Sequence, residues 1–244
     1  MIFEKKSGHI GGSFSIAELV AFLYNEFDLF NCNKIILSKG HAVPIIYAAL
    51  LEKEIISNEE INTFREINSR LQGHPVHWLL PELYATTGSL GQGLSIAVGH
   101  ALSKKIKNED GFVFCILGDG EMQEGQIYEA LMFISKIKLN NLIIFLDSNG
   151  AQNDDYTENI MPLNIQELIN SFDIDYYEII DGNNYDNYLK IKFDLTNGHK
   201  PKFINLNTIK GKGVSFMEGS EWHSKIPNQT EFDLAMEELN AESN

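Results

Sequence analysis

Two short apolar segments, each followed directly by polar and glycine residues, constrain the fold of this chain most strongly. Residues 112–117 (Phe-Val-Phe-Cys-Ile-Leu) are rich in aromatic and β-branched side chains and predict a buried strand. Residues 142–146 (Leu-Ile-Ile-Phe-Leu) predict a second one. Asp119 follows the first segment and Asn149 follows the second, so two neighbouring parallel strands would deliver both side chains to one carboxyl edge of a sheet. Ligands of open α/β folds bind at that edge.

The residues after these strands have the character of a diphosphate and metal clamp. Asp119 and Asn149 both carry oxygen atoms, and a hard cation such as Mg²⁺ prefers one or two protein oxygens together with phosphate oxygens and water. Gly118 and Gly120 would let backbone N–H groups approach a diphosphate closely. An Asp-Gly pair is also typical of a simple tight turn, so the pattern alone leaves both interpretations open. The segment does not place oxygen ligands at the alternating positions of an EF-hand calcium loop.

The remaining hydrophobic patterns predict strands that alternate with helices. Two more strands are predicted at residues 176–180 and 203–207. Helices are predicted at residues 16–27, 44–53, 59–68, 90–105, 123–138, 165–171, 184–195 and 231–239. This alternation predicts an α/β fold, with a parallel sheet covered by helices on both faces. We expect residues 1–244 to form a single domain.

Polar residues indicate where two of these helices begin. Ser15 precedes the first predicted helix and Glu18 follows three residues later, which predicts a capping box. Ser57 or Asn58 is the expected N-cap of the third. The acidic tail after Leu239 is expected to fray.

The composition excludes several classes of protein. Of the 244 residues, 43% are hydrophobic, so the chain can bury a substantial core. Its formal net charge of −15 disfavours nonspecific binding to nucleic acid or to anionic membranes. Cys115 lies in a predicted core strand and Cys32 is the only other cysteine, so we expect no disulfide and a cytoplasmic setting. Residues 1–6 lack the apolar core of a secretory signal, and no apolar segment is long enough to span a bilayer.

Six further segments, each containing glycine or histidine, accompany the two strand ends. They are residues 7–13, 37–42, 73–75, 86–93, 209–214 and 222–223. Together with Gly-Asp-Gly at residues 118–120 and an asparagine about thirty residues later, this set resembles the transketolase family. The Gly-Asp-Gly and asparagine pair is similar to the family's thiamine diphosphate motif, and the other segments follow the transketolase order. The resemblance covers nearly the whole chain.

The resemblance implies that thiamine diphosphate binds at the clamp with Mg²⁺, or with Ca²⁺ or Mn²⁺ in its place. The implied metal ligands are the side chains of Asp119 and Asn149 and the backbone carbonyl of Ala151. The implied cofactor-binding residues are His41, Gly88, Ser89, Leu90, Gly118, Asp119, Gly120, Glu121, Asn149, Lys210 and His223. Free N–H groups at the start of the helix predicted at 90–105 would suit a phosphorylated ligand. Lys210 has a second interpretation, as a solvated lysine.

Four histidines fall on motif positions where transketolases hold active-site histidines. They are His9, His41, His74 and His223. An imidazole can exchange protons near pH 7 and can donate a hydrogen bond to an oxyanion. The resemblance implies that His41 and His223 contact the diphosphate side and the reacting centre, and that His9 shares the proton handling. It implies that His74 binds the terminal hydroxyl of the donor.

Two charged residues are carried over by the same resemblance. Arg65 aligns with an arginine that contacts sugar oxygens of the substrate, although an arginine on a helix surface would look the same. Glu124 matches an acidic catalytic residue that points toward the other half of the dimer and links two cofactor sites through shared protons. A glutamate in the first turn of a helix is also favoured by the helix dipole, so a structural interpretation stays open.

The part of the family's site that these segments do not include implies a partner. In transketolases, a second domain supplies the glutamate that activates thiamine diphosphate and the pocket for its aminopyrimidine ring. The resemblance therefore implies the N-terminal, diphosphate-binding subunit of a split transketolase, active only with a C-terminal transketolase-like subunit. Twofold symmetry favours an α2β2 heterotetramer.

The expected activity is transfer of a two-carbon ketol unit from a ketose, phosphorylated or not, to an aldehyde. A thiamine diphosphate-dependent decarboxylase or ligase subunit that uses a 2-oxo acid is one alternative. A noncatalytic scaffold that binds a partner is another. The motif histidines favour sugars over 2-oxo acids, because polyhydroxy substrates need many polar contacts. They also argue, with Asp119 and Asn149, against the scaffold.

Overall fold

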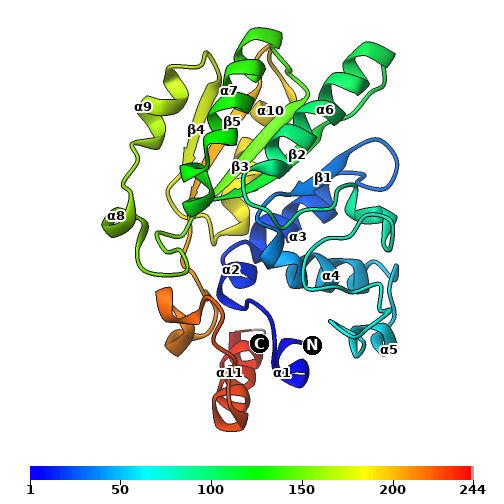
Figure 1. Cartoon of the computed structure of the whole chain (residues 1–244), viewed down its shortest axis with the longest axis vertical. Coiled ribbons are helices and arrows are strands. Elements are labelled where there is room, and N and C mark those ends of the chain that lie inside the picture. The colour runs from blue at the N-terminus through cyan, green and yellow to red at the C-terminus, as the bar shows by residue number, and fades with distance from the viewer. Residues whose placement is uncertain (243–244) are drawn as a thin grey trace.

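The computed structural model has a five-stranded parallel sheet at its centre, and the structure describes residues 1–242 (Figure 1). The strand order is β1-β2-β3-β5-β4. The strands are β1 (Lys34–Leu37), β2 (Val113–Gly118), β3 (Leu142–Ser148), β4 (Asp175–Ile179) and β5 (Lys202–Asn207). This arrangement confirms the predicted α/β fold. The sequence patterns missed β1, because its three consecutive apolar residues are too few to show a clear period.

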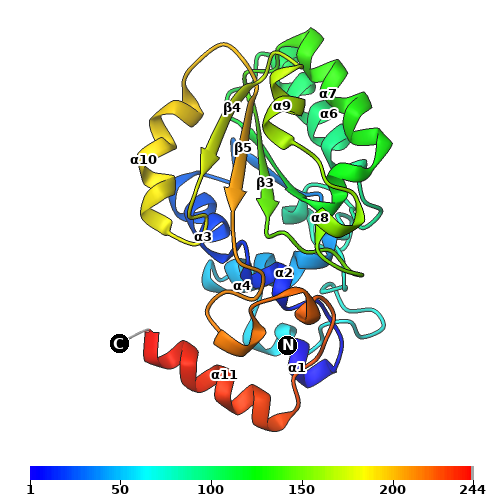
Figure 2. The same cartoon turned by 90° about the vertical axis from the view of Figure 1, so that its left-hand side faces the viewer.

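Helices cover both faces of the sheet (Figure 2). One face packs against α3 (Ala17–Glu26), α4 (Val43–Glu52) and α10 (Tyr185–Thr196). The other packs against α6 (Gln92–Lys107), α7 (Gly125–Ile137) and α9 (Ile165–Asn170). Successive residues of one strand point to opposite layers, and for that reason β2 is apolar up to Leu117 and β3 up to Leu146.

The smaller helices lie in the connections. They are α1 (Ile2–Lys5), α2 (Gly11–Phe14), α5 (Asn58–Ile61), α8 (Thr157–Ile160) and the 3₁₀ turns η1 (Gly40–Ala42), η2 (Pro81–Leu83), η3 (Gly120–Gln123), η4 (Ser215–Met217) and η5 (Ser220–Trp222). The last helix, α11 (Gln229–Glu242), lies beside α1, where the rings of Phe3 and Phe232 stack with centroids 4.1 Å apart. The expected fraying after Leu239 is wrong as far as Glu242, and residues 243–244 lie outside the described part of the chain.

The predicted N-cap at Ser57 is correct, and the predicted capping box of Ser15 and Glu18 is wrong. Ser57 accepts a hydrogen bond from the Glu60 backbone N–H at 3.3 Å, and the Glu60 side chain accepts one from the Ser57 N–H, which caps α5. The N-cap of α3 is Ile16 rather than Ser15. Ser15 Oγ donates instead to Asp147 Oδ2 over 2.6 Å, so a buried tertiary contact has replaced the local cap.

The helix predicted at 59–68 is wrong beyond its first turn. Arg65 and Asn68 both take left-handed backbone conformations, with φ of 61° and 68°. The Arg65 backbone N–H donates to the carbonyl of Leu71 at 2.8 Å, which folds the chain back on itself. Arg65 is therefore a turn residue and does not lie on a helix surface.

Within the described part of the chain, no helix combines the length and the apolar character needed to cross a membrane.

Candidate active site

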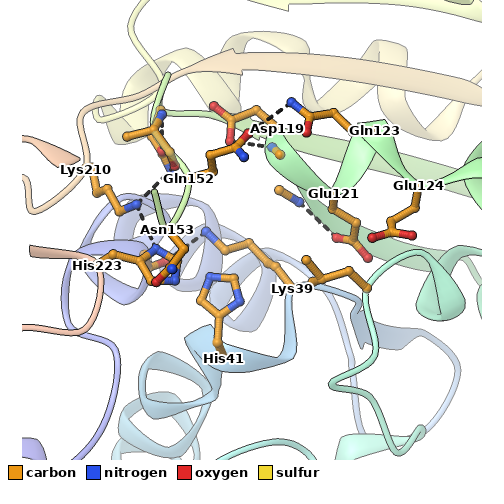
Figure 3. Close-up of a pocket in the computed structure, with 16 residues that line it drawn as sticks. Lys39, His41, Asp119, Glu121, Gln123, Glu124, Gln152, Asn153, Lys210 and His223 are labelled. Atoms are coloured by element: carbon orange, nitrogen blue, oxygen red, sulfur yellow. Dashed lines mark hydrogen bonds between the residues drawn. The ribbon is translucent and has the colours of Figure 1, made fainter. Parts of the chain in front are cut away.

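A pocket of about 240 Å³ opens at the carboxyl edge of the sheet (Figure 3). Its walls come from the turns after β2 and β3, from the loops around α2 and η1, and from the segment after β5. Eleven residues singled out from the sequence line it: His41, Leu90, Gly118, Asp119, Gly120, Glu121, Glu124, Asn149, Ala151, Lys210 and His223. Gly88 and Ser89 lie in the adjoining loop before α6 and are not among the lining residues.

Asp119 lies at the floor of this pocket, one residue past the end of β2. Its Oδ1 accepts from the Gly120 N–H at 2.8 Å, and its Oδ2 accepts from the Gly150 N–H at 2.6 Å. Burial, and then the negative charge of Asp147, raise the pKa of Asp119 to about 6. Among the described residues, none forms an ion pair with this carboxylate.

Asn149 and Ala151 face Asp119 from the turn after β3. The Asn149 Oδ1 accepts from the Ala151 N–H at 3.1 Å, and its Nδ2 donates to Asp147 Oδ2 at 2.8 Å. Parallel pairing of β2 with β3, in which Gly118 lies opposite Asp147, brings the two turns together as the sequence predicted. Three oxygen groups of the predicted metal site therefore surround one end of the pocket.

A buried ion pair beneath this turn was not predicted. Lys39 Nζ contacts Asp147 Oδ2, and both side chains are almost completely buried. The same ammonium donates to the carbonyl of Gly12 at 3.0 Å. The only sequence signal was an aspartate at the very end of an apolar strand pattern, because Lys39 and Asp147 are far apart along the chain.

Glu121 lines the pocket, but its carboxylate is already engaged. Its Oε1 accepts from Ser38 Oγ at 2.5 Å and from the Gly91 N–H at 2.8 Å, and its Oε2 accepts from the Gly118 N–H at 3.1 Å. These bonds join the ends of β1 and β2 to the start of α6. The carboxylate of Glu121 thus braces the walls of the site, and its predicted contact with the cofactor stays a prediction.

Lys210 is buried beside the predicted metal site, so the alternative of a solvated lysine is wrong. Its Nζ donates to the carbonyl of Ala151 at 3.0 Å and lies 2.8 Å from Nδ1 of His223 (Figure 3). Burial, and then the charge of Lys39, lower the pKa of Lys210 to about 8. An ammonium at this position adds a positive charge to the side of the pocket opposite Glu121.

The four motif histidines form one cluster, of which His41 and His223 line the pocket and His9 and His74 lie beside it. The ring of His9 lies 5.3 Å from His41, 6.3 Å from His74 and 5.2 Å from His223, between centroids. His41 and His223 are 5.1 Å apart. Burial, and then Arg65, lower the pKa of His9 to about 4, and burial with Lys210 lowers that of His223 to about 3. Burial also lowers the pKa of His41 and His74, so all four rings are neutral at pH 7.

These pKa values predict how stability depends on pH. Each folded-state pKa lies below the ordinary value of 6.5, so the stability contributed by a neutral histidine is complete above pH 6.5 and is lost as pH falls toward about 4. We expect His9→Gln to make the fall of Tm between pH 6.5 and 4 shallower than in the native chain. Thermal melts in steps of pH measure this. His199→Gln, at an exposed histidine outside the site, is the control, and equal slopes for all three proteins would contradict the prediction.

Arg65 lies near the histidine cluster. Its Nη1 donates to Ser7 Oγ at 2.6 Å, and its charge contributes to the lowered pKa of both His9 and His74. Its Nε has no hydrogen-bond partner among the described residues. A side chain at Gly73 would collide with the guanidinium, because an added Cβ would lie 2.5 Å from Arg65 Nε. The turn therefore brings Arg65 to the site.

Glu124 is exposed at the rim of the pocket, as the N-cap of α7. It packs against Gly91, whose φ of 82° and whose missing Cβ both suit glycine, since an added Cβ would lie 2.9 Å from that of Glu124. Its predicted contact with another subunit stays a prediction.

A metal at this site would rely on mixed oxygen donors. Within residues 1–242, no three His, Cys, Asp or Glu side chains are grouped so as to hold a metal ion by themselves. The groups around Asp119 are a carboxylate, an amide and a backbone carbonyl, which is the donor set of a cation such as Mg²⁺ completed by ligand oxygens and water.

Comparison with known proteins agrees with this arrangement. The family model described as "Transketolase, thiamine diphosphate binding domain" matches residues 1–239. The chain belongs to the transketolase family. Its relatives include an apulose-4-phosphate transketolase subunit of Phocaeicola vulgatus, 35% identical over 253 residues that cover 98% of this chain and 88% of that protein. The 6-deoxy-6-sulfo-D-fructose transketolase subunit SqwG of Clostridium sp. (strain MSTE9) is 40% identical over 222 residues, covering 87% of this chain and 80% of that protein.

Solved transketolases share the fold. The crystal structure of transketolase from Campylobacter jejuni matches 98% of this chain with a TM-score of 0.91 and 27% identity. The chain covers 40% of that protein, so it corresponds to less than half of that transketolase.

Proposed function

We propose that this chain is the diphosphate-binding subunit of a split transketolase, which transfers a two-carbon ketol unit from a ketose to an aldehyde. The observation that carries the proposal is the clustering of four motif histidines, two of which, His41 and His223, line the same pocket as Asp119 and Asn149. Thiamine diphosphate, when bound, supplies the carbon that carries the ketol unit.

The donor set supports a divalent cation and a diphosphate at the inner end of the pocket. Asp119, Asn149 and the carbonyl of Ala151 would hold Mg²⁺. The raised pKa of Asp119 supports this, because a buried carboxylate without a cation partner among the described residues is stabilised by a nearby cation. Lys210 and His223 lie beside Ala151, where they would face diphosphate oxygens.

The histidine cluster supports proton handling at the outer end. A neutral imidazole can accept a proton from a sugar hydroxyl, and Nδ1 of His9 is buried with no partner among the described residues. His41 and His223 lie on either side of the approach to the inner end. His74 lies furthest out beside Arg65 and would bind the terminal hydroxyl of the donor.

The substrate class follows from the charges near His74. Arg65 has no carboxylate partner among the described residues, so its remaining N–H groups suit sugar oxygens or an acidic group on the sugar. The two relatives described above carry a phosphate and a sulfo group in the names of their substrates. We infer a ketose donor, phosphorylated or otherwise acidic.

A partner subunit completes the proposal. The matched family model is a thiamine diphosphate binding domain, and the relatives from Phocaeicola vulgatus and Clostridium are themselves named as subunits. We infer that a C-terminal transketolase-like subunit supplies the aminopyrimidine pocket and the activating glutamate, in an α2β2 assembly.

Product analysis of the mixed subunits tests the reaction. With thiamine diphosphate, Mg²⁺, a ketose phosphate and an aldehyde acceptor, we expect an acceptor lengthened by two carbons and a donor shortened by two. Release of carbon dioxide from a 2-oxo acid, without ketol transfer, would contradict the proposal and favour the decarboxylase alternative. Absence of both reactions would favour the scaffold.

Histidine variants test the roles within the site. We expect His41→Ala and His223→Ala to lower kcat of the assembled enzyme by roughly 10²–10⁴-fold, because each removes an acid–base group beside the reacting centre. Folding stability should change far less than activity, since both residues lie in loops at the pocket. Kinetics and thermal melts of each variant measure the two effects. Loss of folding in step with activity would assign these residues a structural role.

A further inference from the structure

Asp147 is fully buried beside the pocket, and the proposed chemistry assigns it no role. It lies near the end of β3, opposite Gly118 of β2 and Leu206 of β5. Four side chains donate hydrogen bonds to its carboxylate: Ser15, Lys39 and Asn149 to Oδ2, and Thr208 to Oδ1. Such a complete shell holds the carboxylate in one orientation.

The bond to Asn149 decides which end of an amide faces the cation site. Nδ2 of Asn149 donates to Asp147 over 2.8 Å, so Oδ1 must point the other way. That oxygen lies toward Ala151, whose N–H it accepts at 3.1 Å. An ionised carboxylate accepts hydrogen bonds and cannot donate one, so it would repel the amide oxygen if the amide were turned over.

Lys39 contacts the same carboxylate oxygen of Asp147 that accepts from Asn149. Its ammonium contacts Asp147 in an ion pair whose two side chains are 2% and 0% exposed, and it also donates to the carbonyl of Gly12. Together with the hydrogen bonds from Ser15 and Thr208, this contact holds both oxygens of the carboxylate in place beside the amide of Asn149.

We propose that Asp147, held in one orientation by Ser15, Lys39 and Thr208, is a positioning residue that fixes the amide of Asn149 with its oxygen toward the cation. This inference rests on the proposed function, because it concerns the cation that Asn149 would bind. Outer groups that orient a metal ligand typically change metal affinity by about 10–100-fold when they are removed.

A paired substitution removes the carboxylate without leaving a buried charge behind. Lys39→Met with Asp147→Leu replaces the ion pair by apolar side chains of similar volume, which folds often tolerate. The amide of Asn149 then loses its fixed acceptor. We expect the Kd for Mn²⁺ to rise about 10–100-fold, measured by electron paramagnetic resonance on the full chain with thiamine diphosphate present. Circular dichroism reports folding in the same samples.

Thr208→Val is the matched control. It also removes a hydrogen bond to Asp147, but at Oδ1, so the contact that orients Asn149 remains. We expect its Mn²⁺ affinity to stay at the native level. A loss equal to that of the paired variant would assign Asp147 a purely structural role and overturn the proposal.

Asn149→Asp provides a rescue. A carboxylate has two equivalent oxygens and needs no orientation, so this substitution should recover Mn²⁺ binding in the Lys39→Met/Asp147→Leu background. The gain should be larger there than in the native chain, where the new carboxylate would face that of Asp147. Equal gains in both backgrounds, or unchanged Mn²⁺ affinity in a folded paired variant, would overturn the positioning role.

Two further measurements distinguish a failure of the positioning role of Asp147 from a failure of the proposed cation site. Asp119→Ala tests the proposed cation site itself: if it abolishes Mn²⁺ binding while the paired variant does not weaken it, Asp147 has no positioning role and the cation site stands. Native Mn²⁺ affinity in Asp119→Ala would instead remove the cation site from the proposal.

If the paired variant does not fold, hydrogen exchange of the Asn149 side-chain amide in the native chain tests the positioning role. One slowly exchanging proton is expected, and fast exchange of both would overturn the inference.

Discussion

Asp119→Ala will abolish the Mg²⁺-dependent binding of thiamine diphosphate while leaving the fold intact. Asp119 is the only one of the three proposed metal ligands that carries a charge, and its carboxylate lies at the pocket floor rather than within the hydrophobic core. Asn149 and the carbonyl of Ala151 are neutral donors, and neutral oxygens alone bind a hard cation weakly. Loss of the metal would remove the divalent cation that offsets the negative charge of the diphosphate.

The fold should tolerate Asp119→Ala, because the buried, ionised carboxylate of Asp119 lowers the stability of the folded chain. Its folded pKa of about 6 lies above the ordinary 3.8, so ionisation opposes folding, and this cost is complete above pH 6 and disappears below about pH 4. Removing the group at pH 7 relieves that cost and loses two hydrogen bonds from backbone N–H groups. We expect Tm to change little.

Calorimetry with thiamine diphosphate, in the presence and absence of Mg²⁺, measures the binding. Asp119→Asn is the matched variant, since it keeps an oxygen toward the Gly150 N–H but removes the charge. We expect an intermediate loss for it. Native affinity in Asp119→Ala, with a native melting curve, would exclude Asp119 as a metal ligand.

The sequence predicted the carboxyl edge of the sheet well, because the apolar strands and the polar residues that follow them are both local sequence features. A strand that is buried on both faces is built from apolar residues, so the apolar runs that end at residues 117 and 146 indicated where two strands end. Because neighbouring parallel strands end at the same edge of the sheet, the polar residues that follow these runs were expected to lie together. The motif segments then placed the four histidines, which the structure brings within 6.3 Å of His9, between ring centroids.

The features that the sequence did not predict depend on contacts between residues far apart in the chain. Ser15 had the pattern of a helix cap, but its hydroxyl donates to the buried carboxylate of Asp147 and accepts no hydrogen bond from a backbone N–H of α3. The helix predicted through Arg65 stops early because the chain turns there in a left-handed conformation, which no local pattern signalled. The ion pair of Lys39 with Asp147 could not be predicted either, because no local pattern links two residues so far apart in the chain. Each of them alone looks like an ordinary charged side chain beside a strand.

The 244-residue chain by itself will show no ketol transfer and will bind thiamine diphosphate weakly. Its pocket offers oxygen donors at the inner end and imidazoles at the mouth, which suit the diphosphate and the sugar. In the proposal, the partner subunit binds the aminopyrimidine ring. Without that partner the ring stays in water, so the cofactor loses both the contribution of a buried apolar pocket and the glutamate that activates it.

Mixing the chain with a C-terminal transketolase-like subunit should restore both properties together. We expect light scattering to report an α2β2 mass for the mixture, because a twofold axis would place Glu124, exposed at the pocket rim, toward a neighbouring subunit. The ketol-transfer assay on the separate and the mixed chains measures activity, and calorimetry on the same samples measures cofactor affinity. Asp119→Ala in the mixture is the control, since it should assemble without recovering activity. Full activity from the purified chain alone would refute the split-enzyme proposal, because one polypeptide would then supply the whole site.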